Sequence, residues 1–375
     1  MAGIYLHIPF CKKRCLYCDF FSTLDTAQIE RYCHALCREL VLRKSYLHGE
    51  AVSTIYLGGG TPSQLPIHCL REIFDTISTH FTLLPHPEIT IEANPDDLTP
   101  LYVDGLRTLP LNRVSMGVQS FHDPMLSFLG RRHTAAQAME AVKRCYEAGY
   151  DNVSIDLMFS LPGQTMESWE QDLDQALSLG VQHLSAYNLS YEEGTRLTKL
   201  LNDGKIEAVD EETSLALYGR LIDRVTAAGY RHYEISNFAL PGRESRHNSS
   251  YWEGIPYLGV GAAAHSYDGT SRGWNMASLS RYMQGIEEGT PCFEREELDA
   301  TERYNDAIIT RLRTARGLQL SWVQEQFGTA RLQECVAGAQ PFIDRGLLEN
   351  DGSFLHLTRQ GIFVSDSIFR ELIVV

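Results

Sequence analysis

The chain has 375 residues, of which 43% are hydrophobic, and a formal net charge of −15. This length suggests one large domain plus a smaller one, and the negative charge argues against a broad nucleic-acid-binding surface. No apolar run approaches the roughly 20 residues of a membrane span, and the first residues lack the basic and then apolar order of a signal peptide. We therefore expect a cytoplasmic protein without a transmembrane segment and without a nucleic-acid partner.

Short β-rich runs alternate with amphipathic stretches as far as about residue 235. The predicted strands are 3–8, 53–57, 88–93, 113–118, 152–158 and 183–189. The predicted helices between them include 27–42, 67–81, 135–148 and 167–179. A repeat of roughly 30–45 residues fits successive right-handed βαβ units in a parallel sheet. The pattern predicts an α/β fold with an open or partial (β/α)6 barrel, whose sites lie at the carboxyl ends of the strands.

The pattern changes after residue 235. Residues 236–300 are rich in Gly, Ser, His and aromatic residues and show weak periodicity, so they are predicted to form an irregular connecting segment. Residues 301–375 are predicted to form a smaller, mostly helical C-terminal module, which ends with a short hairpin around Asn350-Asp351-Gly352. The predicted parts are therefore 1–235, 236–300 and 301–375.

Three of the nine cysteines, Cys11, Cys15 and Cys18, follow one another with C-x3-C-x2-C spacing. An odd number of cysteines argues against a disulfide framework. Thiolates are the usual ligands of iron–sulfur clusters, and three of them leave one iron of a [4Fe–4S] cluster open to another ligand. A zinc site is the alternative, but zinc sites usually present paired C-x2-C elements and a fourth ligand. The three cysteines therefore predict a [4Fe–4S] cluster.

This spacing after a first strand, with Tyr17 just before the last cysteine, resembles the radical S-adenosylmethionine (SAM) superfamily. The stretches 58–62 (GGGTP), 92–95 (EANP), 117–121 (GVQSF) and 156–164 (DLMFSLPGQ) are similar to one branch of it. That branch contains the oxygen-independent coproporphyrinogen III dehydrogenases (HemN) and the HemW proteins. The resemblance implies that the open iron binds SAM, and that one electron from the cluster cleaves SAM to methionine and a 5′-deoxyadenosyl radical. It also implies a HemN-like C-terminal module.

The same resemblance implies which residues bind SAM. Glycine allows a ligand to approach the backbone closely, and a guanidinium pairs well with the carboxylate of SAM. The matching residues are Tyr5, Tyr17, Gly59, Gly60, Thr61, Glu92, Gln119, Arg131, Asp156 and Ser190. Arg132 is adjacent to Arg131, and the sequence leaves the choice between these two arginines open.

Two features separate the chain from the coproporphyrinogen dehydrogenases. The family pattern of the dehydrogenases has a further cysteine two residues after the third ligand, and here that position is Phe20. Those enzymes also have an N-terminal extension before the first strand, whereas here the first predicted strand begins almost at Met1. We therefore predict that coproporphyrinogen dehydrogenase activity is absent. Whether SAM is cleaved productively in another reaction stays open.

Residues 247–252 (HNSSYW) are similar to the H-N-x-x-Y-W motif of HemW proteins, which are heme chaperones. The resemblance implies that the chain binds heme and delivers it to membrane-bound respiratory hemoproteins, with peripheral membrane association. His247 is the candidate axial ligand, with His265, His232 and Cys292 as competitors, and an ordinary polar loop residue is the alternative for His247. The alternative functions are a dehydrogenase and a radical SAM enzyme with another substrate, such as a methyltransferase. The oligomeric state stays open.

Overall fold

The computed structural model describes residues 1–374, and its central feature is a sheet in which six parallel strands follow one another in sequence order. The strands are β1 (Ala2–Ile8), β2 (Val52–Gly59), β3 (Leu83–Ala93), β4 (Arg113–Gln119), β5 (Val153–Phe159) and β6 (His183–Asn188). Most of their residues are buried on both faces, which explains their nearly continuous apolar sequences. The predicted partial (β/α)6 barrel is confirmed.

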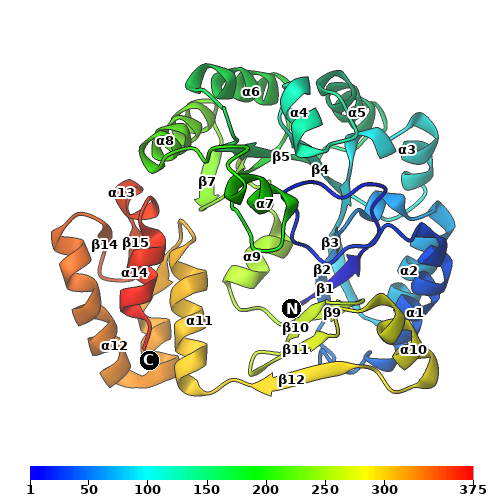
Figure 1. Cartoon of the computed structure of the whole chain (residues 1–375). Coiled ribbons are helices and arrows are strands. Elements are labelled where there is room, and N and C mark those ends of the chain that lie inside the picture. Colours follow the sequence, from blue (N-terminus) through cyan, green and yellow to red (C-terminus); the bar gives the residue numbers. More distant parts are fainter. Residues whose placement is uncertain (375) are drawn as a thin grey trace.

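Helices connect or follow the six strands, and most lie around the outside of the sheet (Figure 1). They are α1 (Ile29–Leu42), α2 (Ile67–His80), α3 (Pro100–Leu106), α4 (Asp123–Leu129), α5 (Ala135–Glu147), α6 (Met166–Ser178), α7 (Arg196–Asn202) and α8 (Glu211–Ala227). Buried residues such as Leu36 and Leu40 of α1 form the apolar face that packs on the sheet. Capping boxes at Thr134 and Thr165 begin α5 and α6. The four predicted helices are confirmed to within about two residues at each end.

Short strands extend the sheet on both sides, and all of them except the one at 231–234 lie in residues 236–300, the segment expected to be irregular. Beyond β6 lie β8 (Asn237–Ala239) and β7 (Arg231–Glu234); beyond β1 lie β9 (Tyr257–Val260), β10 (His265–Tyr267), β11 (Ser271–Asn275) and β12 (Phe293–Glu297). β9 runs parallel to β1, whereas the other added strands pair antiparallel. Helices α9 (Arg246–Trp252) and α10 (Leu279–Glu288) lie between these strands in the sequence. Strands this short show little alternation of polar and apolar residues, so periodicity did not predict them.

The last part of the chain has its own hydrophobic core, which includes Tyr304, Leu312 and Phe342. Its elements are α11 (Ala300–Leu312), β13 (Leu318–Gln319), α12 (Leu320–Asp344), β14 (Leu348–Asn350), β15 (Phe354–Leu357), α13 (Arg359–Ile362) and α14 (Ser365–Leu372). The antiparallel pairing of β14 with β15 confirms the predicted hairpin. An ion pair at 3.3 Å between Arg313 and Glu234 joins this part to the end of β7. No helix within residues 1–374 is both long enough and apolar enough to cross a membrane.

Candidate functional site

The loop that carries the three cysteines follows β1 and is held by backbone contacts with other loops and helices. The N–H of Cys11 donates to the Thr23 carbonyl at 2.9 Å, and the N–H of Leu16 donates to the Leu129 carbonyl of α4 at 3.0 Å. The Leu16 carbonyl in turn accepts from the N–H of Leu197 in α7 at 3.0 Å. These contacts hold the loop over the sheet, and its cysteines are free thiols.

The cysteines open onto a cavity of about 390 Å³ at the carboxyl ends of the parallel strands. All of the residues predicted for the cluster and SAM line this cavity, with the exception of Tyr5. They are Cys11, Cys15, Cys18, Tyr17, Gly59, Gly60, Thr61, Glu92, Gln119, Arg131, Asp156 and Ser190. Arg131 lines the cavity and Arg132 does not, so the structure separates the two adjacent arginines.

Two glycines at the end of β2 let its backbone approach the strand that leads into the cysteine loop. Gly59 has a φ of +111°, and a Cβ at this position would lie 2.7 Å from the imidazole of His7. A Cβ at Gly60 would lie 2.8 Å from the carbonyl carbon of Pro9. Thr61 follows and places its Oγ1 3.4 Å from the Sγ of Cys11. A side chain at either glycine would therefore displace the residues that lead into the loop.

Arg131 brings positive charge to the cysteines. Its Nη1 donates to the Sγ of Cys15 at 3.4 Å, and its Nη2 donates to the Oδ1 of Asn94 at 2.6 Å and to the carbonyl of Gly117 at 2.5 Å. Burial raises the pKa of the Cys11 thiol, and the positive charge of Arg131 opposes that rise. The buried Nε of Arg131 has no hydrogen-bond partner among residues 1–374. A guanidinium beside thiols, with an N–H to spare, fits an anionic cluster and a ligand that carries a carboxylate.

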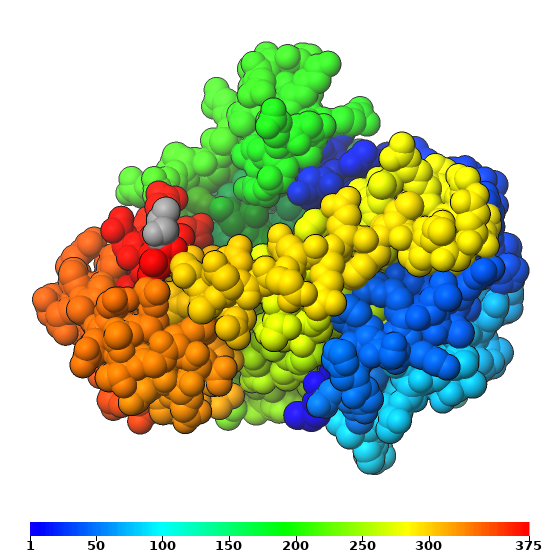
Figure 2. Space-filling view, turned by 90° about the horizontal axis from the view of Figure 1, so that it is seen from below, coloured from blue at the N-terminus to red at the C-terminus, as the bar shows by residue number. Residues whose placement is uncertain are grey.

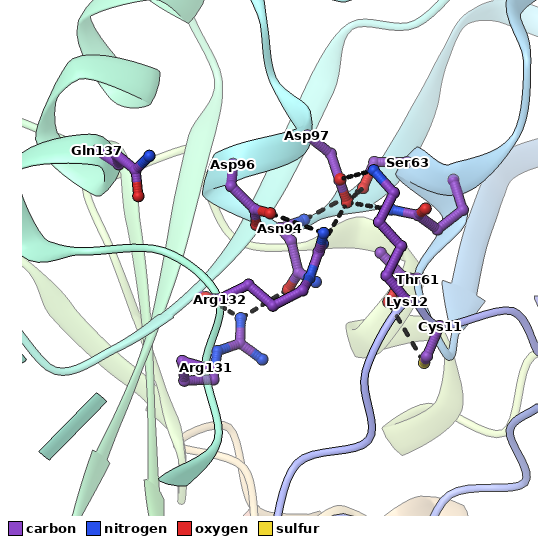
Figure 3. Close-up of polar contacts among 12 residues, drawn as sticks. Cys11, Lys12, Thr61, Ser63, Asn94, Asp96, Asp97, Arg131, Arg132 and Gln137 are labelled. Atoms are coloured by element: carbon purple, nitrogen blue, oxygen red, sulfur yellow. Dashed lines mark hydrogen bonds and ion pairs between the residues drawn. The ribbon is translucent and has the colours of Figure 1, made fainter. Parts of the chain in front are cut away.

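Asp97, which none of the sequence motifs includes, joins the loops around the cavity (Figure 3). Its Oδ1 accepts from the Nζ of Lys12 at 3.0 Å. Its Oδ2 accepts from the Ser63 hydroxyl at 3.0 Å, from Arg132 at 2.9 Å and from the amide of Gln64. One buried carboxylate thus holds together the cysteine loop, the loop after β2 and the loop after α4. The signal that could have identified it is the acidic pair directly after the EANP motif.

Two half-buried carboxyl groups line the cavity, Glu92 from β3 and Asp156 from β5. The Oε1 of Glu92 accepts from the Tyr56 hydroxyl at 2.7 Å, and its Oε2 accepts from the N–H of Gly59 at 3.2 Å. Burial raises the pKa of Glu92 to about 7 and that of Asp156 to about 6. A cationic ligand would favour the ionised form of both groups, which fits SAM because its sulfonium is positively charged.

Gln119, at the end of β4, has a φ of +73°. This left-handed conformation is uncommon for a residue with a side chain and concentrates at binding and catalytic sites. The side chain of Gln119 lines the same cavity as Tyr17 and Ser190, of which Ser190 is exposed. The strand therefore ends in a left-handed backbone conformation at a residue that lines the cavity.

The H-N-x-x-Y-W motif forms α9, which lies against the sheet inside the barrel. The Ser245 hydroxyl caps the helix by accepting from the N–H of Asn248 at 3.3 Å. The carboxylate of Glu88, on β3, accepts from the N–H groups of Arg246 at 3.0 Å and His247 at 2.9 Å. These contacts fix the first turn of α9 and carry the His247 side chain into the interior.

His247 is fully buried and its two ring nitrogens are both occupied. The Nδ1 lies 2.8 Å from the Oγ1 of Thr54, and the Nε2 lies 2.8 Å from the hydroxyl of Tyr251. The ring stacks on Tyr56 at 5.0 Å and on Tyr5 at 6.4 Å, and burial lowers its pKa to about 3. This arrangement leaves His247 no free nitrogen for heme iron, so it speaks against the predicted axial ligand. It also places Tyr5 in the stack instead of on the cavity wall.

The three competing candidates lie in different surroundings. The ring of His232 stacks on Phe238 at 4.3 Å, and its Nε2 lies 3.2 Å from the carbonyl of Ile235. Cys292 precedes β12 and is half-buried. His265 is exposed on β10. Of the three histidines, His265 is the one whose imidazole is exposed and makes no hydrogen bond with another residue of the described range 1–374.

Both the sequence and the fold are similar to those of known proteins. Residues 5–176 match the Radical SAM superfamily, and residues 298–364 match the HemN C-terminal domain. The chain is 35% identical to the heme chaperone HemW of Mycobacterium tuberculosis over 99% of this chain and 94% of that protein. It is 34% identical to the heme chaperone HemW of Bacillus subtilis over 98% of each. The structure of the radical SAM enzyme coproporphyrinogen III oxidase (HemN) from Escherichia coli matches with a TM-score of 0.86 at 25% identity, over 100% of this chain and 90% of that one.

Proposed function

Because the chain belongs to the HemW family of radical SAM proteins, we propose that it is a heme chaperone that also binds a [4Fe–4S] cluster and SAM. It passes its heme to membrane-bound respiratory hemoproteins, working from the cytoplasm and meeting the membrane peripherally. The observation that carries this proposal is the extent of the similarity. Identity of 35% to a heme chaperone runs through 99% of the chain, so both the barrel and the C-terminal part have their counterparts there.

The cluster would be held by Cys11, Cys15 and Cys18, which leave one iron for SAM. The chemistry that the cluster and SAM supply when bound is the one-electron reductive cleavage of SAM. Arg131 offsets the negative charge of the thiolates through its contact with Cys15. Its Nε, which has no hydrogen-bond partner within the described residues 1–374, is the group that we assign to the carboxylate of SAM.

The remaining cavity residues would hold the rest of SAM. We assign the amino group to the backbone of Gly59 and Gly60 and the hydroxyl of Thr61, and the ribose and sulfonium to Glu92 and Asp156. The adenine would lie beside Tyr17, with Gln119 and Ser190 completing its surroundings. Tyr5 does not line the cavity but packs next to Glu92, which does. Both side chains lie against Gly58, where a Cβ would be 3.0 Å from the Tyr5 ring and 3.1 Å from Glu92.

A coproporphyrinogen dehydrogenase is the second candidate, because the fold matches that of HemN with a TM-score of 0.86. Phe20 counts against it. This residue takes the position of the further cysteine in the dehydrogenases, lines the cavity and is 62% exposed. It therefore presents an apolar ring at the mouth of the cavity where those enzymes present a thiol.

Two measurements on the full chain, with the cluster reconstituted anaerobically, test the proposal. Titration with heme, followed by the Soret absorbance, is expected to give a saturable, stoichiometric complex. Incubation with coproporphyrinogen III, SAM and a reductant is expected to give no protoporphyrinogen IX by HPLC with mass spectrometry. Absence of a saturable heme complex would reject the chaperone, and formation of protoporphyrinogen IX would favour the dehydrogenase.

A further inference from the structure

A second cavity lies between the added strands of the sheet and the C-terminal part of the chain. Its volume is about 530 Å³, and it shares no lining residue with the cavity at the cysteines. Its walls come from the end of α9, from β9, β10 and β11, and from α11 and α12. Figure 2 shows the C-terminal part in orange and red, beside the yellow segment that contains the later strands of the sheet. We call this space the strand–module cavity.

Aromatic rings form much of its lining. The six aromatic residues other than histidine are Tyr251, Trp252, Tyr257, Tyr267, Trp322 and Phe327. Rings of this kind offer large, rigid, flat apolar surfaces to a ligand. Tyr251 and Trp252 are the last two residues of the H-N-x-x-Y-W motif. The motif therefore contributes to this cavity through its aromatic residues, while His247 lies behind Tyr251 and holds its hydroxyl at 2.8 Å.

Three arginines line the same cavity, and two of them lack a carboxylate partner within residues 1–374. Arg272 pairs with Asp306, another lining residue. Arg303 donates only to the backbone carbonyl of Asp299, at 3.4 Å. Arg311 donates to the backbone carbonyl of Glu253 at 3.1 Å, and its guanidinium lies 3.8 Å from the centre of the Trp322 ring.

The charge on Arg311 is poorly solvated in this position. The side chain is half-buried, and burial lowers the pKa of its guanidinium. The neighbouring carboxylate of Glu253 is engaged by Arg316 at 3.4 Å. A half-buried cation without an anionic partner favours an anionic ligand, because such a ligand would replace the hydration that the cation has lost.

His265 adds a metal-binding group to the wall. Its side chain is exposed on one side, and the partial burial of its ring together with the positive charge of Arg272 lowers its pKa. Neither ring nitrogen makes a hydrogen bond with another described residue. Its ring lies 6.1 Å from that of Trp274 on the neighbouring strand β11. A neutral imidazole with a free nitrogen is a common axial ligand of heme iron.

We propose that the strand–module cavity is the site that holds heme, with the imidazole of His265 on the iron and with Arg303 and Arg311 on the propionates. Heme is a flat apolar macrocycle with two carboxylates and an iron that accepts axial ligands, and the cavity offers a partner for each of these three features. This proposal rests on the proposed heme chaperone function and specifies where the cargo lies.

The axial ligand is tested by heme titration of the full chain with Soret and electron paramagnetic resonance spectra. His265→Ala is expected to lose the histidine-ligated spectrum, and His265→Cys to replace it with a thiolate spectrum. His80→Ala removes another exposed histidine, one that does not line the cavity, and is expected to leave the spectrum unchanged. If His265→Ala retains the wild-type spectrum and affinity, the proposed ligand is wrong.

The propionate contacts are tested with the double variant Arg303→Gln/Arg311→Gln, because each charge-assisted contact that is lost is expected to weaken heme binding by about tenfold. Heme dimethyl ester, which lacks the propionate charges, is the matched probe. Its affinity is expected to be the same for the wild type and the double variant. Equal heme affinity of the two proteins would overturn the assignment of the cavity. Failure of the wild type to bind heme at all would instead reject the chaperone function on which the assignment rests.

Discussion

Glu92 provides a test of SAM binding whose size follows from the structure. With a pKa of about 7, the ionised fraction of this carboxyl rises from about one tenth at pH 6 to about nine tenths at pH 8. If the cation of SAM requires the ionised form, the affinity for SAM should rise by about tenfold over this range. In Glu92→Gln the contribution disappears, because the amide carries no charge at either pH.

The assay is isothermal titration of SAM into the reconstituted protein at pH 6, 7 and 8, in two buffers with different heats of ionisation. The wild type is expected to release protons on binding at pH 6 and to release almost none at pH 8. SAM has its own amino group that titrates, but this contribution is common to the wild type and Glu92→Gln and cancels in the comparison. An equal pH dependence of both proteins would refute the reasoning.

The raised pKa of Glu92 also makes the stability of the ligand-free protein depend on pH. The affinity for SAM should rise with pH, whereas the free energy of unfolding should fall. Burial raises the pKa of Glu92 above its usual 4.5, so the folded chain binds the proton more tightly than the unfolded chain does. The stabilisation is fully present below pH 4.5 and is lost as the pH rises through about 7. Between pH 6 and pH 8 the loss is on the order of 1 kcal/mol. Urea unfolding of the ligand-free wild type and Glu92→Gln at both pH values would measure it.

Three further predictions concern the cysteine loop and its supports. Serine at any one of the three cysteines should abolish the [4Fe–4S] signal in Mössbauer spectra, and a full cluster in such a variant would contradict the ligand assignment. Gly60→Ala should lower the free energy of unfolding in urea by about 1–3 kcal/mol and weaken SAM binding, because its Cβ would meet the Pro9 carbonyl. The control Gly338→Ala, in α12, should change neither quantity by much. Asp97→Asn should lower the free energy of unfolding by about 1–3 kcal/mol, because it removes the charge that pairs with Lys12 and Arg132, while Arg132 keeps its ion pair with Asp96 at 2.7 Å. Iron content after reconstitution should fall as well. Unchanged unfolding and iron content would show that this carboxylate does not organise the loops.

The barrel could be predicted because its strands and helices are long enough to show their periodicity. Residues at the strand ends, such as Glu92 and Asp156, could be placed together because parallel strands share one carboxyl edge. The strands β9 to β12 could not be predicted, since each has only three to five residues, too few to show a clear alternation of polar and apolar residues. Asp97 could not be identified from the sequence, because its hydrogen bonds join three loops that only the fold brings together.

The surroundings of His247 also could not be predicted from the sequence, because they too depend on contacts that only the fold brings together. A motif shows that a histidine and two aromatic residues occur together, but not which of them faces a ligand. Burial inside the barrel and the hydrogen bonds to Thr54 and Tyr251 depend on the packing of α9 against the sheet. The accessible imidazole of His265 lies 18 residues later, outside the motif.

The buried stack around His247 connects the surroundings of the two cavities. Glu92, on the first cavity, accepts from the hydroxyl of Tyr56; Tyr56 stacks on His247; and His247 holds Tyr251, on the second cavity. If ligand binding at one end shifts this row of side chains, the two ligands share a coupling free energy. Thermodynamic reciprocity then requires that SAM change the affinity for heme by the same factor by which heme changes the affinity for SAM. Measuring this change in affinity in both directions would show whether the SAM and heme sites are coupled. A factor of one would mean that the four side chains separate the two sites without coupling them.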